Sequence, residues 1–273
     1  MNHSKGITIL RQITALLLSL IVIIPMLLVI INSFKTRNEA LVMNFSLPRK
    51  LMFENYLEVI ERGKLISSFF NSLIYSFGSI TIATLATLMA AFVLARNKTK
   101  LNNIIYYFII AGIVLPLNMV SLMTVMKSLD LVNTKIGIIL LYAGLLIPLS
   151  LFITYGFFST VPIEIDEAAV IDGCGSYMLF FNIILPLMKP VAVTLVVLNF
   201  LTVWNQFLLP LYFLNSSLNW PMTLAVYQFF GLYDQAWNLV SADVILTALP
   251  ILLLYIAGQK FIIAGITAGA VKG

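Results

Sequence analysis

The stretch IGIILLYAGLLIPLSLFITYGFF, residues 136–158, contains no Lys, Arg, Asp or Glu side chain. A helix of about 20 apolar residues crosses the hydrocarbon core of a bilayer, which is about 30 Å thick. Lipid offers no partners for free backbone groups, so a crossing segment satisfies its own backbone as a helix. Strands of a membrane barrel would be about 10 residues long and would alternate in hydrophobicity. This stretch shows no alternation, and it therefore predicts a transmembrane helix.

Five other stretches have the same character, with charged residues only near their ends. In chain order, the six stretches are residues 13–34, 73–95, 104–126, 136–158, 191–214 and 244–264. We therefore expect an all-α membrane protein with six transmembrane helices. Prolines inside these stretches each remove one helix hydrogen bond and favour a kink; they are Pro25, Pro116, Pro148, Pro210 and Pro250.

The composition excludes a soluble domain. The chain of 273 residues is 61% hydrophobic and 10% charged, whereas a soluble domain carries about 25% charged residues. The charged side chains are too few to cover a globular surface, so membrane lipid must cover it. The net charge is +5. We assign this excess to Lys and Arg residues that flank membrane spans, and we expect no binding to nucleic acid.

The sequence offers little material for catalysis. The single cysteine, Cys174, cannot form a disulfide within the chain or a zinc cluster alone. The single histidine, His3, argues against a catalytic triad or a metal site built on histidine. The pair Gly63-Lys64 lacks the upstream glycine and the following Ser or Thr of a Walker A loop. We therefore expect no enzyme activity, no metal and no cofactor.

The first apolar stretch resembles a signal peptide only in part. Lys5 and Arg11 precede it, but it continues to Phe34, whereas a signal peptide has an apolar region of about 7–15 residues. We expect residues 1–34 to remain as the first transmembrane helix. The positive residues divide equally between the two sides, but Arg96, Lys98 and Lys100 cluster in one short loop, which favours an N-terminus inside the cell.

This orientation divides the chain into four regions. Residues 1–34 form the first transmembrane helix, residues 35–72 an extracytoplasmic loop, residues 73–264 the core, and residues 265–273 a cytoplasmic tail. The loop between spans four and five, residues 159–190, then lies inside the cell.

Loop 159–190 is acidic and partly apolar. Four acids stand against the single base Lys189: Glu164, Asp166, Glu167 and Asp172. Acids on the cytoplasmic face favour a docking surface for a protein over one for anionic lipid. The alternative is an amphipathic helix that lies in the membrane interface.

The same loop predicts two short helices. Pro162 suits the first turn of a helix, which then runs to about Asp172 and ends at Gly173 and Gly175. Ser176 is placed to cap a second helix, and Pro186 and Pro190 separate it from span five. Ala168, Ala169 and Gly173 would give the first helix one smooth side that another protein can approach closely.

This loop resembles the EAA signature of ABC-importer permeases. Glu167-Ala168-Ala169, three residues, Gly173, nine residues, Ile183, one residue and Leu185-Pro186 match every fixed position. The tail from Gln259 to Gly273 is similar to that of the maltose-importer permease. Other segments similar to the sugar-importer branch are residues 129–134, Val161-Pro162, Asn71-Ser72-Leu73 and Trp204-Asn205. The resemblance runs from about Ser33 to the last residue.

The resemblance implies a type I, binding-protein-dependent permease subunit in a bacterial inner membrane, with an ABC type I permease core and a cytoplasmic EAA coupling helix between helices 4 and 5. Its partners would be a second homologous permease subunit, two cytoplasmic ATPase subunits and an extracytoplasmic sugar-binding protein. The permease pair would form a pore for a sugar or oligosaccharide, and the partner subunits would hydrolyse ATP. Alternating access by rigid-body rocking would drive transport.

The resemblance also implies roles for residues. Glu167 would be the polar anchor of the ATPase-coupling site and Gly173 its sharp turn. The residues assigned to coupling are Glu164, Glu167, Ala168, Ala169, Asp172 and Gly173, and those of the tail that would contact the ATPase are Gly269, Lys272 and Gly273. The chain departs from the family at Cys174, where alanine is usual, and at Gln206, where an acid is common.

Candidates for the translocation path are polar residues near or inside spans five and six. Such residues usually face the bundle or a cavity; those chosen are Asn199, Trp204, Asn205, Gln206 and Asp243. Trp204 could stack on a sugar ring, although aromatic residues in spans more often serve packing. Asp243 could instead be a solvated residue at a helix end.

Other functions stay open at this stage. A self-sufficient secondary transporter would be expected to have buried ionisable groups or inverted repeats, and neither is clear. An ABC permease for a non-sugar solute is a variant of the main prediction, and the sugar-type tail argues against it. An intramembrane enzyme would need a catalytic constellation that one His and one Cys do not supply.

Overall fold

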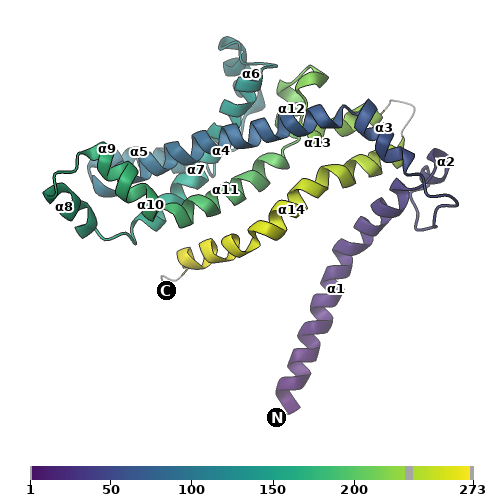
Figure 1. Ribbon diagram of the computed structural model, residues 1–273, viewed down its shortest axis with the longest axis horizontal. Coiled ribbons are helices and arrows are strands. Elements are labelled where there is room, and N and C mark those ends of the chain that lie inside the picture. The colour runs from purple at the N-terminus through teal and green to yellow at the C-terminus, as the bar shows by residue number, and fades with distance from the viewer. Residues whose placement is uncertain (1, 231–235, 271–273) are drawn as a thin grey trace. The chain divides into compact units, whose positions relative to one another are not determined.

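The computed structural model describes residues 2–230 and 236–270. All secondary-structure elements in this part of the chain are helices (Figure 1). The prediction of an all-α protein is therefore confirmed for these residues. The α-helices are α1 (Asn2–Ser33), α2 (Arg37–Ala40), α3 (Glu54–Arg62), α4 (Leu65–Arg96), α5 (Lys100–Ala111), α6 (Met119–Ser128), α7 (Lys135–Phe158), α8 (Glu164–Ile171), α9 (Ser176–Met178), α10 (Leu185–Leu187), α11 (Lys189–Trp204), α12 (Leu208–Phe213), α13 (Met222–Ala225) and α14 (Trp237–Ala270). A π-helix, η1 (Leu179–Ile184), and two 3₁₀ helices, η2 (Ser217–Asn219) and η3 (Val226–Phe229), complete the described set.

Fewer uninterrupted spans are present than the sequence predicts. In the described part of the chain, four helical segments are long and apolar enough to cross a membrane: Leu10–Ser33, Leu65–Arg96, Lys135–Phe158 and Trp237–Gln259. A fifth crossing is reached if Ser176–Leu187 and Lys189–Trp204, which meet at a bend of 70°, count as one. These helices make the protein a multi-pass membrane protein, and residues 2–230 and 236–270 do not contain six uninterrupted spans.

The predicted third span, residues 104–126, is two helices. Helix α5 ends at Ala111 and α6 begins at Met119. Pro116 lies between them, and it has no N–H to donate and disfavours helical geometry in the residue before it. Asn118 then starts α6, since its Oδ1 accepts a hydrogen bond from the N–H of Ser121 at 3.0 Å. A proline and a new N-cap therefore replace the expected continuous helix.

The predicted fifth span, residues 191–214, is interrupted as well. Helix α11 begins at Lys189 and stops at Trp204, before Pro210 is reached. At this end the side chain of Asn205 donates from Nδ2 to the carbonyl of Leu201 at 2.8 Å. An asparagine side chain that binds its own backbone competes with continuation of the helix. The following α12 is a separate short helix.

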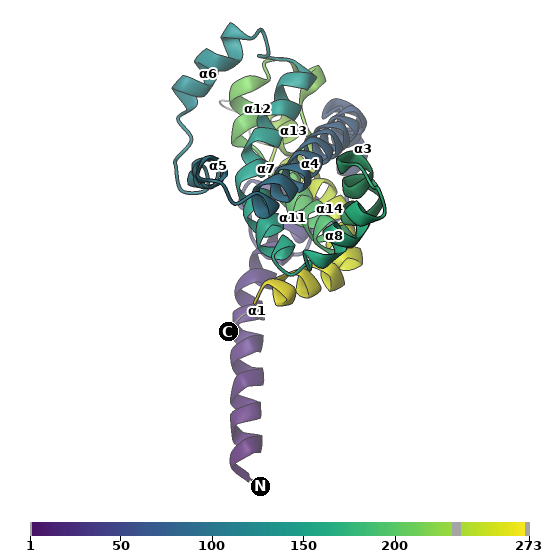
Figure 2. The ribbon, with the colours of Figure 1, turned by 90° about the vertical axis from the view of Figure 1, so that its left-hand side faces the viewer.

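The chain divides into two compact units. Unit 1 contains residues 1–67 and 222–250, and unit 2 contains residues 68–221 and 251–273. In unit 1, α1 is one long helix (Figure 2). Its side chains from Leu10 to Leu27 are exposed, and most of them are apolar. The hydroxyls of Thr14 and Ser19 donate to carbonyls one turn earlier, at Leu10 and Ala15. Such a helix suits contact with lipid on all sides.

A polar cluster joins the parts of unit 1 where α1 ends. Asn55 on α3 donates from Nδ2 to the carbonyls of Ser33 and Lys35, at 2.7 and 2.9 Å. Asn238 at the start of α14 donates in turn to Oδ1 of Asn55 at 2.9 Å. The ammonium of the fully buried Lys35 donates to the backbone and side-chain oxygens of Asn44. The predicted extracytoplasmic loop 35–72 thus contains α2, α3 and the first residues of α4.

Unit 2 is built around α4, α7 and α11. Helix α7 packs against both α5 and α11, and the buried pair Asn199 and Ser150 links α11 to α7, with Nδ2 and Oγ 3.0 Å apart. A core of apolar side chains fills the end of this bundle that carries α8. Its fully or nearly fully buried members are Leu88, Phe158, Ala169, Leu179, Phe180, Ile184, Met188, Val191 and Leu195. In Figure 1, α8 and α12 lie toward opposite ends of unit 2.

Candidate functional site

Helix α8 is the centre of the candidate site, and its end agrees with the prediction. It runs from Glu164 to Ile171, Asp172 follows as the C-cap, and Gly173 has φ +84°. This left-handed conformation is open to glycine at little cost. A Cβ on Gly173 would meet no atom within 4 Å, so the backbone conformation is the sole steric reason for glycine here.

Two local predictions about this loop were wrong. Pro162 lies before α8, whose N-cap is Ile163, because the chain turns sharply after Phe158 and the helix starts only at Glu164. Ser176 is the first residue of α9, and the N-cap is Gly175, which makes no side-chain capping bond. Both errors shift a helix start by one or two residues and leave the two-helix arrangement of the loop intact.

The inner face of α8 is part of the core of unit 2. Ala169 is buried against the cluster that includes Phe158 of α7 and Leu179, Phe180 and Ile184 of η1. Ala168, one position earlier, is exposed. The predicted smooth side of Ala168, Ala169 and Gly173 is therefore wrong, because successive residues of a helix point about 100° apart. The packed face marks α8 as an integral part of the bundle.

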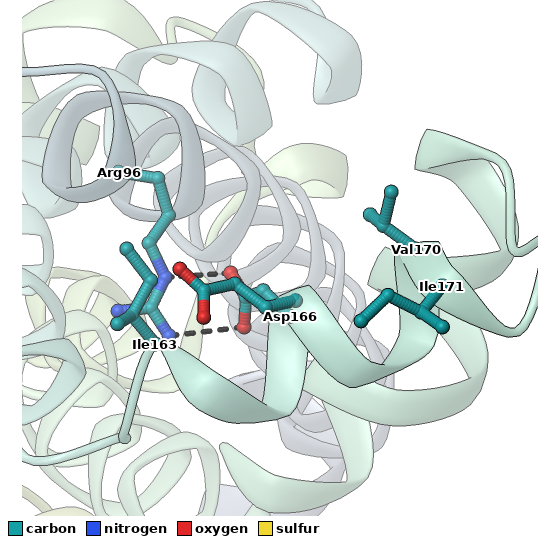
Figure 3. Close-up of a pocket in the computed structure, with 6 residues that line it drawn as sticks. Arg96, Ile163, Asp166, Val170 and Ile171 are labelled. Atoms are coloured by element: carbon teal, nitrogen blue, oxygen red, sulfur yellow. Dashed lines mark hydrogen bonds and ion pairs between the residues drawn. The ribbon is translucent and has the colours of Figure 1, made fainter.

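One ion pair fixes α8 to the end of α4. The guanidinium of Arg96 donates from Nε to Oδ2 of Asp166 at 2.7 Å and from Nη2 to Oδ1 at 3.0 Å (Figure 3). It also donates to the carbonyls of Val161 and Pro162, at 3.2 and 3.3 Å. The charge lies 4.6 Å from the ring centroid of Phe158. Both partners are largely buried, and a two-point contact of this kind fixes orientation as well as distance.

The outer face of α8 combines exposed apolar residues with acids. Ile171 is 85% exposed and Val170 is 60% exposed. An open hollow of about 510 Å³ lies beside them; it is lined by Arg96, Ile163, Asp166, Glu167, Val170 and Ile171 (Figure 3). The sequence-predicted residues that remain exposed on this helix and its turn are Glu164, Glu167, Ala168, Asp172 and Gly173. Exposed apolar side chains beside acids are typical of a protein-binding surface.

Sequence reasoning missed Arg96 as a site residue. From the sequence alone, Arg96 is only one of the positive charges that favour an N-terminus inside the cell. The signal available was an arginine at the end of a span, close in the predicted topology to a loop rich in acids. The sequence does not say which acid it meets, and the structure selects Asp166 and leaves Glu167 exposed.

The predicted path residues lie in different surroundings within their own units. Trp204 is 3% exposed and stacks on Phe200, with ring centroids 5.1 Å apart, and it meets Phe69 edge to face. Asn199 is buried against Ser150. Both therefore have packing partners within unit 2. Asn205 is exposed and Gln206 half-buried at the break after α11, and Asp243 is buried in unit 1.

The predicted tail contacts are described only in part. Gly269 lies in the last turns of α14, while Lys272 and Gly273 lie outside the described residues. Among the described residues, no group of three or more His, Cys, Asp or Glu side chains is arranged to hold a metal ion.

Comparison with a solved structure agrees with this architecture. The chain superposes on one chain of the crystal structure of a bacterial ABC transporter involved in the import of the acidic polysaccharide alginate, with a TM-score of 0.83. The match covers 95% of this chain and 98% of the other, at 16% sequence identity. At this identity the likeness concerns the fold.

Several sequence relatives are permeases of sugar uptake systems. The probable starch degradation products transport system permease of Thermoanaerobacterium thermosulfurigenes is 35% identical over 94% of both chains. The diacetylchitobiose uptake system permease of Streptomyces coelicolor is 35% identical, over 94% of this chain and 86% of the relative. The melibiose/raffinose/stachyose import permease of Bacillus subtilis is 33% identical, over 92% of this chain and 91% of the relative.

A family model covers most of the chain, including α8 and the Arg96 contact. It is described as the inner membrane component of binding-protein-dependent transport systems and matches residues 83–268. Together with the relatives, this match confirms the resemblance drawn from the EAA loop. The chain belongs to the family of binding-protein-dependent transport system inner membrane components.

Proposed function

We propose that this chain is a permease subunit of a bacterial ABC importer that moves a sugar or oligosaccharide across the inner membrane. It would work with a second homologous permease subunit, two cytoplasmic ATPase subunits and an extracytoplasmic sugar-binding protein. The relatives are named for starch degradation products, diacetylchitobiose and melibiose, raffinose or stachyose. These names support a carbohydrate substrate.

The observation that carries the proposal is the attachment of α8. One face of this helix is fixed to the bundle through Asp166 and Ala169, and the other presents Val170 and Ile171 to the outside. A helix held in this way transmits displacement to α4 and α7, because a two-point ion pair and close packing both resist sliding. These are the properties required of a coupling helix.

The proposed cycle uses this attachment. Nucleotide binding favours one arrangement of the two ATPase subunits, and their closure displaces the two coupling helices. The Arg96 contact and the Ala169 packing carry this movement to the permease helices, which rock as bodies and switch access from the inside to the outside. In this cycle the ATPase would contact Glu164, Glu167, Ala168, Asp172 and Gly173, while Ala169 would act from the buried side.

The topology proposed for this cycle has six crossings with the N-terminus inside. The third crossing would consist of α5 and α6, interrupted at residues 112–118, and the fifth would be α11. The opposite ends of unit 2 that carry α8 and α12 would then face the cytoplasm and the outside. Asn205 and Gln206, at the break after α11, would be the candidates for contact with the sugar, and the tail from Gly269 to Gly273 would contact the ATPase.

The test is purification of the tagged chain from detergent-solubilised membranes, followed by uptake assays. We expect an ATPase and a second permease to copurify, and we expect uptake of labelled sugar to stop when the ATPase carries a substitution that abolishes hydrolysis. Uptake that persists without any ATPase would overturn the proposal in favour of a self-sufficient carrier.

The solute class needs a separate measurement. Binding of radiolabelled sugars and of radiolabelled amino acids to the cognate binding protein would be compared. Binding of sugars supports the carbohydrate importer. Binding of amino acids alone would leave the permease assignment in place and overturn the sugar.

A further inference from the structure

The turn between α6 and α7 bonds to a segment far away in the chain. Asn133 lies in this turn with φ +60°, and its Oδ1 accepts hydrogen bonds from the backbone N–H groups of Asn215 and Ser216, at 3.1 and 3.0 Å. Its own N–H donates to the carbonyl of Phe213 at 2.8 Å. The side chain of Asn219 donates to its carbonyl at 3.0 Å. One residue thus holds the end of α12 and the chain that follows it.

Helix α4 holds the same segment from another side. The buried Asn71 donates from Nδ2 to the carbonyls of Leu218 and Trp220, at 2.8 and 3.2 Å. The hydroxyl of the buried Tyr75 donates to the carbonyl of Asn219 at 2.7 Å. We call Asn71, Tyr75 and Asn133 the latch, and residues 205–220 the return segment.

The two asparagines of the latch use opposite ends of their amide groups. Asn133 faces two N–H groups, so its oxygen must point at them, and Asn71 faces two carbonyls, so its nitrogen must point at them. The assignment of each amide is therefore unambiguous. It also means that aspartate can replace Asn133 and keep the acceptor, while aspartate at position 71 would aim a carboxylate at two carbonyl oxygens.

The start of the return segment is fixed as well. Helix α11, which precedes it, is joined to α7 by Asn199 and Ser150, and Trp204 at its end packs on Phe69 of α4. The chain is therefore attached to α4 and α7 before the break at residues 205–207, and the latch attaches it again after the break. Such a segment has little freedom to move as a lid on its own.

We propose that Asn133 and Asn71 are positioning residues for transport, which keep the return segment attached to α4 and α7 through the cycle. Access at this end of unit 2 opens by movement of these helices together with the segment. The exposed Asn205 and the half-buried Gln206 consequently keep their place relative to the bundle in every state. This inference rests on the proposed function for its cycle, whereas the attachment itself is measurable without one.

The first measurement is a distance between spin labels on the two sides of the latch. Leu129 and Leu218 are both exposed and would carry the labels in a Cys174→Ala background, with the complete transporter in lipid nanodiscs. We expect one narrow distance distribution, unchanged between the nucleotide-free state and the ATP-bound state of hydrolysis-deficient subunits. A wild-type distance that changes between these states would overturn the proposal.

The matched variants separate the side-chain acceptor from the backbone conformation. Asn133→Gly keeps access to positive φ and removes the acceptor, while Asn133→Asp keeps both. We expect Asn133→Gly to broaden the distance distribution, to lower sugar uptake several-fold and to raise the ATP hydrolysed per sugar. Asn133→Asp should behave as wild type, and Asn71→Asp should behave as Asn133→Gly.

Contrary results have distinct meanings. If Asn133→Gly has the same distances, the same sugar uptake and the same ATP hydrolysed per sugar as the wild type, the proposed role of the latch is contradicted. A wild-type complex with no ATP-driven uptake would instead sink the proposed function, and the comparison of Asn133→Gly with Asn133→Asp in the nucleotide-free state would still test the attachment.

Discussion

Arg96 at the end of α4 holds Asp166 of α8 through two hydrogen bonds, from Nε and from Nη2, to the two oxygens of one carboxylate. The same guanidinium donates to two carbonyls of the chain that leads into α8. One side chain therefore sets both the start and the orientation of the helix on which the proposed coupling depends.

Arg96→Lys should separate transport from ATP hydrolysis. Lysine keeps the charge but has no planar fork, so it cannot make the two-point contact. Removing one partner of a buried ion pair lowers the free energy of unfolding by about 3–5 kcal/mol, and we expect a loss of roughly half of this for a substitution that keeps the charge. Sugar uptake should fall about tenfold, while the protein remains in the membrane.

A matched control for this substitution is Arg62→Lys. Arg62 pairs with Glu58 one turn away on α3, and both side chains are exposed. Exposed pairs of this kind contribute about 0–1 kcal/mol, so uptake should be unchanged. Equal uptake by wild type, Arg96→Lys and Arg62→Lys would show that the contact does not transmit movement.

Gly173→Val should uncouple the permease from its ATPase. A residue with a branched side chain at φ +84° is strained by about 1–3 kcal/mol, so the turn after α8 must change its course. Gly175, in the same loop, has φ −72° and open space around it, and Gly175→Ala should be tolerated. The measurements are membrane level, copurified ATPase and uptake. Normal uptake by Gly173→Val would count against the coupling role of this turn.

Asn199→Ala should act on stability more than on sugar affinity. The substitution removes a buried hydrogen bond to Ser150, which should lower the free energy of unfolding by about 1–2 kcal/mol. Thr202→Ala on the same helix is the control, because Thr202 is exposed and bonds to its own helix. Thermal unfolding in detergent would be compared with the KM of uptake. A raised KM with unchanged unfolding would instead place Asn199 in the sugar path.

The stability of the start of α2 should depend on pH through the carboxylate of Glu39. This carboxylate accepts hydrogen bonds from the backbone N–H and the hydroxyl of Thr36. These bonds lower the pKa of Glu39 from the usual 4.5, and the bond from the backbone N–H has the larger effect. A lowered folded-state pKa means that the stabilisation is complete above about pH 4.5 and is lost as the pH falls through the folded-state value.

Hydrogen exchange corrected for the intrinsic rate would measure this effect in residues 36–40. We expect protection to fall below about pH 4.5 in the wild type and to stay constant, at a lower level, in Glu39→Gln. The same pH dependence in both proteins would exclude Glu39 as its source.

By itself the sequence determined the class of protein and the local events along it. Long uncharged stretches have one stable state in lipid, so the helical membrane architecture followed from composition and length alone. The end of α8 at Gly173 followed from the freedom of glycine at positive φ. The EAA spacing pointed to the family that the comparisons then confirmed.

Tertiary structure decided which of two neighbouring side chains forms the ion pair with Arg96. Asp166 and Glu167 are adjacent acids, and nothing local distinguishes them, yet Asp166 meets an arginine 70 residues away and Glu167 does not. The latch at Asn133 has the same origin, because it depends on backbone groups that are satisfied by partners distant in the chain, and such pairing exists only once the helices are packed. The division of residues 104–126 and 191–214 into shorter helices has local causes instead, at Pro116, Asn118 and Asn205.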